Sequence, residues 1–283
     1  MKHQNPDMLL FIGIGDAFAA GVEYVDNHKN PELIKRALKF EEYVQHPTHS
    51  ALSPGAYTDD TEMSVANARV LVEHGWPYNN LMFADSYVRE FLRGGGRKGY
   101  SRQFQSFLEG LKSGEEFLAR INPNSNKNGA AMRAVPFGVL RTIGHVLEVA
   151  ELQAKITHNT PEGIFSSRVV ALMSHFSLYE DGPLSDLPDY CRSHLPSDSV
   201  KIFNKVFTSR WPNSAIDNRL YGSVAISTVH AVIDALTHQK TLLDMMRQKP
   251  HGVSPCGCFI LRWCARHPLS KFDKNTTIVY YAC

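Results

Sequence analysis

Apolar residues recur at spacings of three and four along most of this 283-residue chain, and this helical period constrains the fold more than any other feature. In one segment, Met63, Ala66 and Val70 would lie on the same face of a helix. The same pattern predicts helices over 79–93, 102–120, 130–149, 161–179 and 220–247. Alternation typical of strands is scarce, and its best example is 201–207. We therefore predict an all-α fold in one domain.

The charge and hydropathy of the chain limit the classes of partner that it can bind. Thirty Lys and Arg residues against 28 Asp and Glu leave a net charge of +2, so no strong positive field is available to hold a nucleic-acid backbone. The longest apolar runs, such as 8–14, are far shorter than the roughly 20 residues that span a bilayer. The first residues do not resemble a signal peptide. We expect a soluble, cytoplasmic protein without nucleic-acid or membrane partners.

The densest polar cluster lies directly before the helix expected from Met63. It reads Thr58-Asp59-Asp60-Thr61-Glu62. One interpretation is helix capping, in which Asp59 and Glu62 form a pair resembling a capping box. The other is a magnesium site, because carboxylate and hydroxyl oxygens are the ligands that a small hard cation accepts. The cluster alone leaves both interpretations open.

Three further segments place small or polar residues where a ligand can approach. Gly13-Ile14-Gly15-Asp16 lacks the third glycine of a dinucleotide-binding fingerprint, and in a close-packed helix Asp16 would need a buried partner. The junction Asn128-Gly129-Ala130-Ala131-Met132-Arg133 is either an ordinary helix start or a phosphate seat on free backbone N–H groups. His158 belongs either to a plain loop before a helix or to a ligand site.

In this order and spacing, the four segments resemble the ADP-ribosylglycohydrolase family over roughly residues 8–247. Thr58-Asp59-Asp60-Thr61 followed by Met63 is the most specific of these motifs. The resemblance implies an all-helical, orthogonally packed single domain that holds two Mg²⁺ ions, with Mn²⁺ as a substitute. It implies a hydrolase of the N- or O-glycosidic bond between ADP-ribose and a protein side chain. Its partner would then be ADP-ribose or an ADP-ribosylated protein.

The resemblance also assigns roles to single residues. Thr58, Asp59 and Asp60 match metal ligands, and Asp59 and Asp60 would also orient the attacking water or accept its proton. Glu23 resembles a loop glutamate that some members use near the metals, and it completes the catalytic set. The residues that match the lining of the ADP-ribose pocket are Asn128, Gly129, Ala130, Met132 and His158.

The sequence changes character near residue 249. The family closes its metal site with Asp-x-Asp-Thr near the C-terminus, and the nearest substitute here, Asp273-Lys274-Asn275-Thr276, lacks the second aspartate. Four of the five cysteines lie in this stretch, without a fourth zinc ligand at a standard spacing. We interpret 1–248 as the helical domain and 249–283 as an atypical cysteine-containing tail, replaced or frame-shifted.

The missing motif keeps two other functions open. Without the second aspartate, the second metal ion would lose ligands and activity would be impaired. The alternatives to an active hydrolase are a relative that binds ADP-ribose or an ADP-ribosylated protein without turnover, and an immunity-type interaction protein.

Two short motifs stay outside the resemblance. His46-Pro47-Thr48-His49 lacks a third metal ligand at a useful spacing. The glycine-rich segment 94–100 is either a flexible connector or a phosphate contact.

Overall fold

The computed structural model describes residues 6–23, 30–211, 222–238, 241 and 244. Within these ranges the regular structure is helical, without strands, and one isolated β-bridge joins Asn124 to His158. The prediction of an all-α fold is therefore confirmed. Its α-helices are α1 (Met8–Ala20), α2 (Pro31–Ala37), α3 (Asp59–Glu73), α4 (Asn80–Arg93), α5 (Arg102–Glu109), α6 (Gly114–Arg120), α7 (Gly129–Met132), α8 (Ile143–Thr157), α9 (Pro161–Tyr179), α10 (Leu187–His194), α11 (Ser197–Phe203), α12 (Lys205–Thr208) and α14 (Val224–His238). Two 3₁₀ helices, η2 (Val135–Val139) and η3 (Leu184–Asp186), interrupt them.

The predicted helices over 79–93 and 161–179 form, and two others split. Of the predicted segment 220–247, residues 224–238 form α14, and most of the rest lies outside the described residues. Residues 161–179 form α9 as predicted, with Pro161 at the first helical position. The segment 102–120 breaks into α5 and α6, because the Ser113 side chain caps a new helix by accepting a hydrogen bond from the Glu116 N–H at 3.3 Å. The segment 130–149 breaks at η2, which contains Pro136.

The segment 201–207, the best example of alternation in the sequence, is not a strand. It covers the end of α11 and most of α12. Phe203 and Val206 are buried, and their spacing of three is the spacing of a helix face. Seven residues are too few for a period of two to outweigh this burial.

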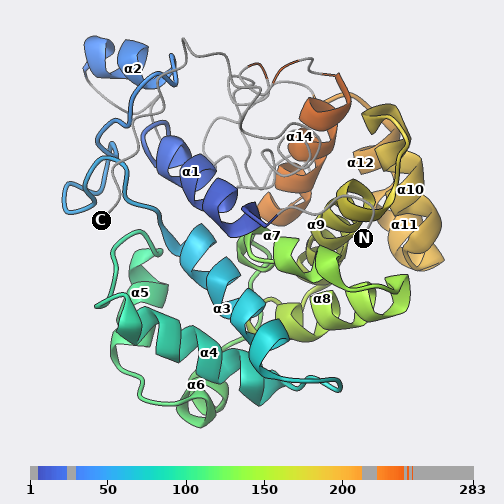
Figure 1. Cartoon of the computed structure of the whole chain (residues 1–283), viewed down its shortest axis with the longest axis horizontal. Coiled ribbons are helices and arrows are strands. Elements are labelled where there is room, and N and C mark those ends of the chain that lie inside the picture. The colour runs from blue at the N-terminus through green and yellow to red at the C-terminus, as the bar shows by residue number, and fades with distance from the viewer. Residues whose placement is uncertain (1–5, 24–29, 212–221, 239–240, 242–243, 245–283) are drawn as a thin grey trace.

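Helix α9 is the central element of the core. Its residues are buried from Gly163 through nearly every position to Leu178, as expected of a helix that is covered on all sides. It packs against α7, α8, α10, α14 and η2, and Figure 1 shows α14 on one side of it and α8 on the other. The neighbours of α9 therefore fix the frame on which the shorter helices lie.

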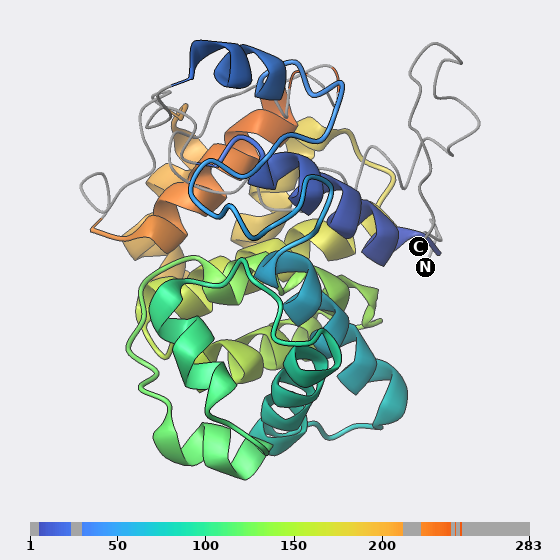
Figure 2. The same ribbon diagram turned by 90° about the vertical axis from the view of Figure 1, so that its left-hand side faces the viewer.

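Helix α3 joins the two ends of the molecule. It packs against α1 on one side and against α4 on the other. Figure 2 shows α4, α5 and α6 gathered at one end, and α2 and α14 at the opposite end. The first turn of α3, which carries the polar cluster, thus lies between these ends, next to α1 and α7.

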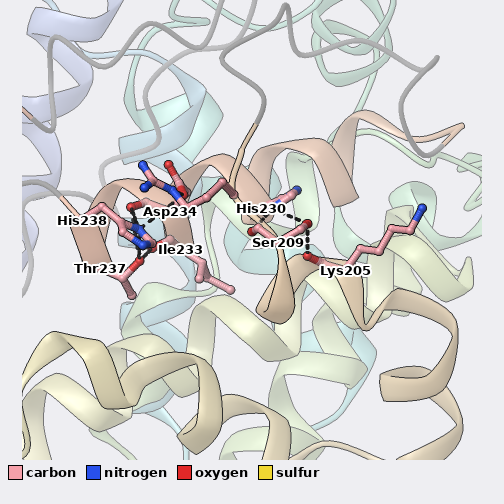
Figure 3. A network of polar contacts seen from close by, with 8 residues as sticks. Lys205, Ser209, His230, Ile233, Asp234, Thr237 and His238 are labelled. Atoms are coloured by element: carbon pink, nitrogen blue, oxygen red, sulfur yellow. Dashed lines mark hydrogen bonds and ion pairs between the residues drawn. The ribbon is translucent and has the colours of Figure 1, made fainter.

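Polar contacts tie the middle and end of α14 to the segment that follows α12. Figure 3 shows His230, whose Nε2 lies 2.8 Å from the carbonyl oxygen of Ser209. The buried carboxylate of Asp234 accepts a hydrogen bond from Arg210 Nε at 2.5 Å and lies 3.3 Å from His238 Nδ1. Charged groups around a buried carboxylate offset the cost of removing it from water.

The start of α14 holds the loop before α7. Ser223 Oγ donates a hydrogen bond to the Asn126 carbonyl oxygen at 2.8 Å, and the Ala225 N–H donates to the same oxygen at 3.2 Å. On the other side of the loop, the Asn159 N–H donates to the Pro123 carbonyl oxygen at 2.6 Å. This loop leads directly into the predicted pocket segment, which is therefore fixed from two sides.

In the part of the chain that the structure describes, no helix has the length and apolar character that crossing a bilayer requires. The tail 249–283, including Asp273-Lys274-Asn275-Thr276, lies outside the described residues. The domain boundary at 248 and the replaced or frame-shifted origin of the tail therefore stay predictions.

Candidate functional site

Asp16 of α1 organises the start of α3. Its buried carboxylate accepts hydrogen bonds from the N–H and Oγ1 of Thr58, at 2.8 and 2.7 Å, and from the N–H and Oγ1 of Thr61, at 3.1 and 2.6 Å. Burial raises the pKa of Asp16, and the four hydrogen bonds oppose that rise. The aspartate in the apolar run therefore has the buried partners that it needs.

The structure does not show the capping box. Thr58 is the N-cap residue of α3, but its side chain accepts no hydrogen bond from the first turn. The Glu62 carboxylate contacts Tyr100 and Arg97. The interpretation of Asp59 and Glu62 as a capping pair is therefore wrong, because Asp59 is the first helical residue rather than the N-cap and Glu62 is engaged by other elements.

Thr58, Asp59 and Asp60 present oxygen atoms at one helix start. Because Thr58 Oγ1 donates its proton to Asp16 Oδ1, its lone pairs face away from that bond and remain able to accept. Asp59 is half-buried and Asp60 is buried. The result is a donor set of hydroxyl and carboxylate oxygens in a sheltered place.

Asp59 lies in a strongly negative environment. Its pKa is raised well above the usual aspartate value, first by burial and then by the charges of Asp16 and Glu23. Glu23 follows the end of α1, and its charge acts on Asp59. These two predicted catalytic residues therefore lie in one neighbourhood. We refer to five carboxylates as the acidic group: Asp16, Glu23, Asp59, Asp60 and Glu62.

The glycine-rich segment 94–100 packs against the acidic group. Tyr100 OH donates to Glu62 Oε1 at 2.8 Å, and Arg97 Nε lies 3.4 Å from Glu62 Oε2. The Arg97 guanidinium also lies 3.9 Å from the centre of the Tyr57 ring and donates to its OH at 3.1 Å. Burial raises the pKa of Glu62, while Tyr100 and Arg97 oppose that rise. The segment therefore supplies partners to α3 and is more than a connector.

A glycine is required where this segment meets Thr58. Gly99 has a φ of +129°, and a Cβ atom there would lie 2.9 Å from Thr58 Cβ. Gly95, with a φ of +70°, faces open space. Gly99 thus lets the backbone approach the residue next to Asp59, whereas Gly95 serves the turn alone.

The predicted pocket segment forms the short helix α7 and its N-cap. Asn128 precedes the helix, and Ala130 and Met132 are buried within it. A Cβ atom on Gly129 would lie 2.8 Å from His158 Cε1. The imidazole therefore lies directly against the Gly129 backbone, and the structure brings these predicted pocket residues together.

His158 is held as a neutral imidazole. Arg133 Nη2 donates to Thr157 Oγ1 at 2.6 Å, and Thr157 Oγ1 lies 2.7 Å from His158 Nδ1. The threonine hydroxyl thus links the Arg133 guanidinium to the His158 ring. Burial, followed by the charges of Arg133 and Lys127, lowers the pKa of His158 to about 3.

Contacts from α3 join the pocket segment to the acidic group. Ser64 Oγ donates to the Met132 carbonyl oxygen at 3.4 Å, and Asn67 Nδ2 donates to the Arg133 carbonyl oxygen at 2.7 Å. The predicted metal ligands and the predicted pocket residues thus lie on elements in mutual contact. Among the described residues, no hydrogen bond links the acidic group directly to His158.

The donor chemistry of Thr58, Asp59 and Asp60 fits a hard cation such as Mg²⁺ or Mn²⁺, because all of these atoms are oxygens. Between residues 6 and 244, as far as they are described, no group of three or more His, Cys, Asp or Glu side chains is arranged as a metal site. The three residues would therefore supply part of a coordination shell. Metal binding and the roles of the site residues stay predictions.

Sequence reasoning missed two contributors to this site, Tyr100 and Arg97, and left the partners of a third, Asp16, unknown. Asp16 was recognisable as a buried carboxylate in an apolar run, without a sign of which groups it would contact. Tyr100 and Arg97 carried no local signal, since their contacts with Glu62 span 38 and 35 residues of sequence.

Comparisons with known proteins show the family of this chain. The family model of ADP-ribosylglycohydrolases matches residues 8–256. An ADP-ribosylarginine hydrolase of Pseudomonas putida is 26% identical over 184 residues, covering 60% of this chain and 45% of that protein. The ADP-ribosyl-dinitrogen reductase glycohydrolase of Rhodospirillum rubrum is 31% identical over 167 residues, covering 54% of this chain and 50% of that protein.

The chain spans about half the length of the curated relatives that it matches. The fold itself is that of a solved ADP-ribosylglycohydrolase-related protein complex, with a TM-score of 0.67 and 21% identity over 95% of this chain and 89% of that one. The family match across most of the chain decides the classification: this protein belongs to the ADP-ribosylglycohydrolase family.

Proposed function

We propose that this protein hydrolyses the glycosidic bond between ADP-ribose and a protein side chain, and so reverses mono-ADP-ribosylation. Membership of the family supports hydrolase chemistry on ADP-ribose. The observation that carries the proposal is the contact between α3, whose first turn presents Asp59 and Asp60, and the predicted pocket segment, through Ser64 to the Met132 carbonyl oxygen and Asn67 to the Arg133 carbonyl oxygen. Carboxylates held next to a ligand pocket can accept the proton that attack by water releases.

The reaction replaces one bond to the anomeric carbon of ribose by another. A water oxygen forms a bond to this carbon as the bond to the side-chain nitrogen or oxygen breaks, through a transition state that resembles an oxocarbenium ion. One water proton passes to a carboxylate, for which Asp59 and Asp60 are the candidates. The leaving nitrogen or oxygen takes up one proton in turn, which returns the carboxylate to its starting form. Glu23, whose charge acts on Asp59, is our candidate for relaying this proton.

Thr58, Asp59 and Asp60 are the residues that would hold Mg²⁺. Bound magnesium would lower the pKa of a water molecule and would bind the ribose hydroxyls. The part of Asp16 is to fix the Thr58 hydroxyl through its own hydrogen bonds. Because these hydrogen bonds hold the Thr58 oxygen in place before the metal binds, less free energy is needed to assemble the site.

The substrate side of the site is α7 with its neighbours. In α7 the N–H groups of Ala131 and Met132 donate to the Asn128 carbonyl oxygen, so those of Gly129 and Ala130 are the ones that suit the pyrophosphate of ADP-ribose. The His158 ring lies against Gly129. We assign ADP-ribose binding to Asn128, Gly129, Ala130, Met132 and His158.

The proposal is tested by measuring release of ADP-ribose from an ADP-ribosylated protein, with arginine-linked and serine-linked substrates in parallel. We expect release in Mg²⁺ and its loss in EDTA. The Asp59→Asn variant should be slower by about 100-fold or more. Asp189→Asn is the matched control, because that aspartate is exposed on α10 and its loss should leave the rate unchanged.

Two results would contradict the proposal. The first is binding of ADP-ribose by the wild-type protein without release from any modified protein. The second is release that neither EDTA nor Asp59→Asn reduces.

A further inference from the structure

His46 has a defined protonation pattern. Its ring is buried, and Nδ1 accepts hydrogen bonds from the backbone N–H groups of Thr48 and His49, each at 3.1 Å. An Nδ1 that accepts twice carries no proton, so the proton of the ring is on Nε2. The turn after His46 therefore fixes both the tautomer and the orientation of the imidazole.

The opposite edge of the ring faces Glu23. His46 Nε2 lies 3.0 Å from Glu23 Oε2, and the exposed fraction of the side chain is 2% for His46 and 20% for Glu23. With its proton on Nε2, the imidazole donates this hydrogen bond, and the Glu23 carboxylate accepts it. A fixed donor thus meets a carboxylate that retains access to solvent on its other side.

Packing of their neighbours holds Glu23 and His46 close together. Val22 precedes Glu23, and Val44 lies two residues before His46. Both valines belong to one apolar cluster with Ala37 of α2. A Cβ atom on Gly21 would lie 3.0 Å from the Val44 carbonyl oxygen. The end of α1 and the segment that carries His46 are therefore in close contact independently of the hydrogen bond.

The neighbourhood of Glu23 includes the catalytic candidate on α3. The negative charge of Glu23 is one of the causes that raise the pKa of Asp59, after burial and the charge of Asp16. The carboxylates of Asp59 and Glu23 repel each other, so Glu23 by itself would be driven away from α3. A donor that holds Glu23 in place opposes this repulsion.

We propose that His46 is a positioning residue, which holds the Glu23 carboxylate beside Asp59 through a hydrogen bond from Nε2. The motif His46-Pro47-Thr48-His49, which lacks a third metal ligand, then has a role without metal: its backbone N–H groups orient the imidazole. This inference rests on the hydrolase function proposed above, in which Glu23 takes part in the reaction.

Two substitutions separate the two edges of the ring. In His46→Asn, the amide oxygen takes the place of Nδ1 and keeps the backbone turn, but the side chain is too short to reach Glu23. In His46→Gln, the amide nitrogen takes the place of Nε2 and reaches Glu23. We expect His46→Asn to lower kcat by about 10-fold to 100-fold with little change in KM, and His46→Gln to recover part of the loss.

The double variant tests whether His46 acts through Glu23. If it does, Glu23→Gln combined with His46→Asn should be no slower than Glu23→Gln alone, whereas independent effects would multiply. His74→Asn is the matched control, because His74 is exposed at the C-terminal end of α3. Thermal unfolding of each variant checks that the fold is retained.

A measurement without turnover separates this inference from the proposed function. In ¹⁵N NMR of the imidazole, we expect a protonated Nε2 and an unprotonated Nδ1 for His46, with an Nε2 resonance that shifts in Glu23→Gln. A wild-type protein that releases no ADP-ribose would contradict the function alone. A proton on Nδ1, full kcat in His46→Asn, or multiplied losses in the double variant would each overturn the positioning role.

Discussion

At the scale of single residues, Asp16 and Asp59 show two fates of a carboxylate in an apolar setting. Asp16 is buried but accepts four hydrogen bonds from Thr58 and Thr61, which replace the water that it has lost. Asp59 meets further negative charge, and its pKa is raised the more strongly of the two. Folding therefore disfavours the ionised form of both aspartates, and at Asp16 the four donors offset part of that cost.

We therefore predict that removing the charge of Asp59 stabilises the folded protein. In EDTA at neutral pH, Asp59→Asn should unfold at a higher temperature than the wild type, because the neutral amide avoids both desolvation of a charge and repulsion by Asp16 and Glu23. Since the pKa is raised in the folded state, the difference should shrink as the pH falls towards the usual aspartate value of 3.8.

Magnesium should reverse the order of the unfolding temperatures of the wild type and Asp59→Asn. A ligand that binds the folded state stabilises it by mass action, so Mg²⁺ should raise the unfolding temperature of the wild type and leave that of Asp59→Asn unchanged. Scanning calorimetry with and without Mg²⁺ measures both effects, and Asp189→Asn on α10 should follow the wild type in each condition. A variant that is less stable than the wild type in EDTA would contradict the electrostatic account of Asp59.

His158 makes a separate prediction on pH. Its pKa falls from 6.5 to about 3 on folding, so between these values the unfolded chain binds a proton that the folded protein does not. Stability from this residue is complete above pH 6.5 and is lost as the pH falls. Between about pH 5.5 and 4, the free energy of unfolding should decline by about 1.4 kcal/mol per pH unit more steeply in the wild type than in His158→Asn.

Urea unfolding at a series of pH values measures these slopes. Above pH 6.5 the two proteins should differ by a constant amount, because His158 is neutral in both states there. Equal slopes on the acid side would show that the imidazole is protonated in the folded protein.

At the scale of elements, a loop without regular structure shapes the start of α3. The segment 94–100 brings Tyr100 and Arg97 to Glu62, and Gly99 lets it pass close to Thr58. Loops that carry functional contacts are often held by a rigid scaffold, and here α3 and α4 supply it. The geometry at Thr58 and Asp59 thus depends on a glycine some forty residues away in sequence.

Two glycine substitutions in this segment should differ sharply. Gly99→Ala places a Cβ atom 2.9 Å from Thr58 Cβ at a φ of +129°, so we expect a loss of about 1–3 kcal/mol in stability and a large loss of ADP-ribose release. Gly95→Ala has open space at a φ of +70°, and should cost about 1–2 kcal/mol with the rate unchanged. Chemical denaturation and initial rates decide between them, and equal losses of rate would exclude a specific role for Gly99.

At the scale of the whole molecule, α9 carries the stability on which the site depends. It contacts the helix that bears His158 as well as the one next to Asn128. A cavity in this helix would therefore loosen the frame around the pocket segment. Interiors are densely packed, so a removed side chain is only partly replaced by its neighbours.

Leu172→Ala should lower the free energy of unfolding by about 2–5 kcal/mol, because Leu172 is fully buried in α9. Val72→Ala is the matched control: Val72 is 86% exposed on α3, and its truncation should change stability by about 0.5 kcal/mol or less. Urea titration followed by circular dichroism compares them. A similar small effect at both positions would mean that α9 is not the centre of the core.

The amino-acid sequence by itself determined the helices and the place of the acidic cluster. The sequence placed α9 at 161–179 with Pro161 at its first position, because proline is favoured at the first turn of a helix. Pro136 and Ser113 changed two predicted helices into shorter ones, since capping and proline effects compete locally with the period. The order of the four motifs was enough to indicate the family.

The tertiary structure alone decided which side chains meet. Asp16 reaches Thr58 across 42 residues, Tyr100 reaches Glu62 across 38, and His46 reaches Glu23 across 23. None of these pairs follows a local spacing rule, because each depends on how two separately formed segments pack together. Local propensity fixes the backbone of one segment at a time, whereas contacts between segments follow from burial of the shared core.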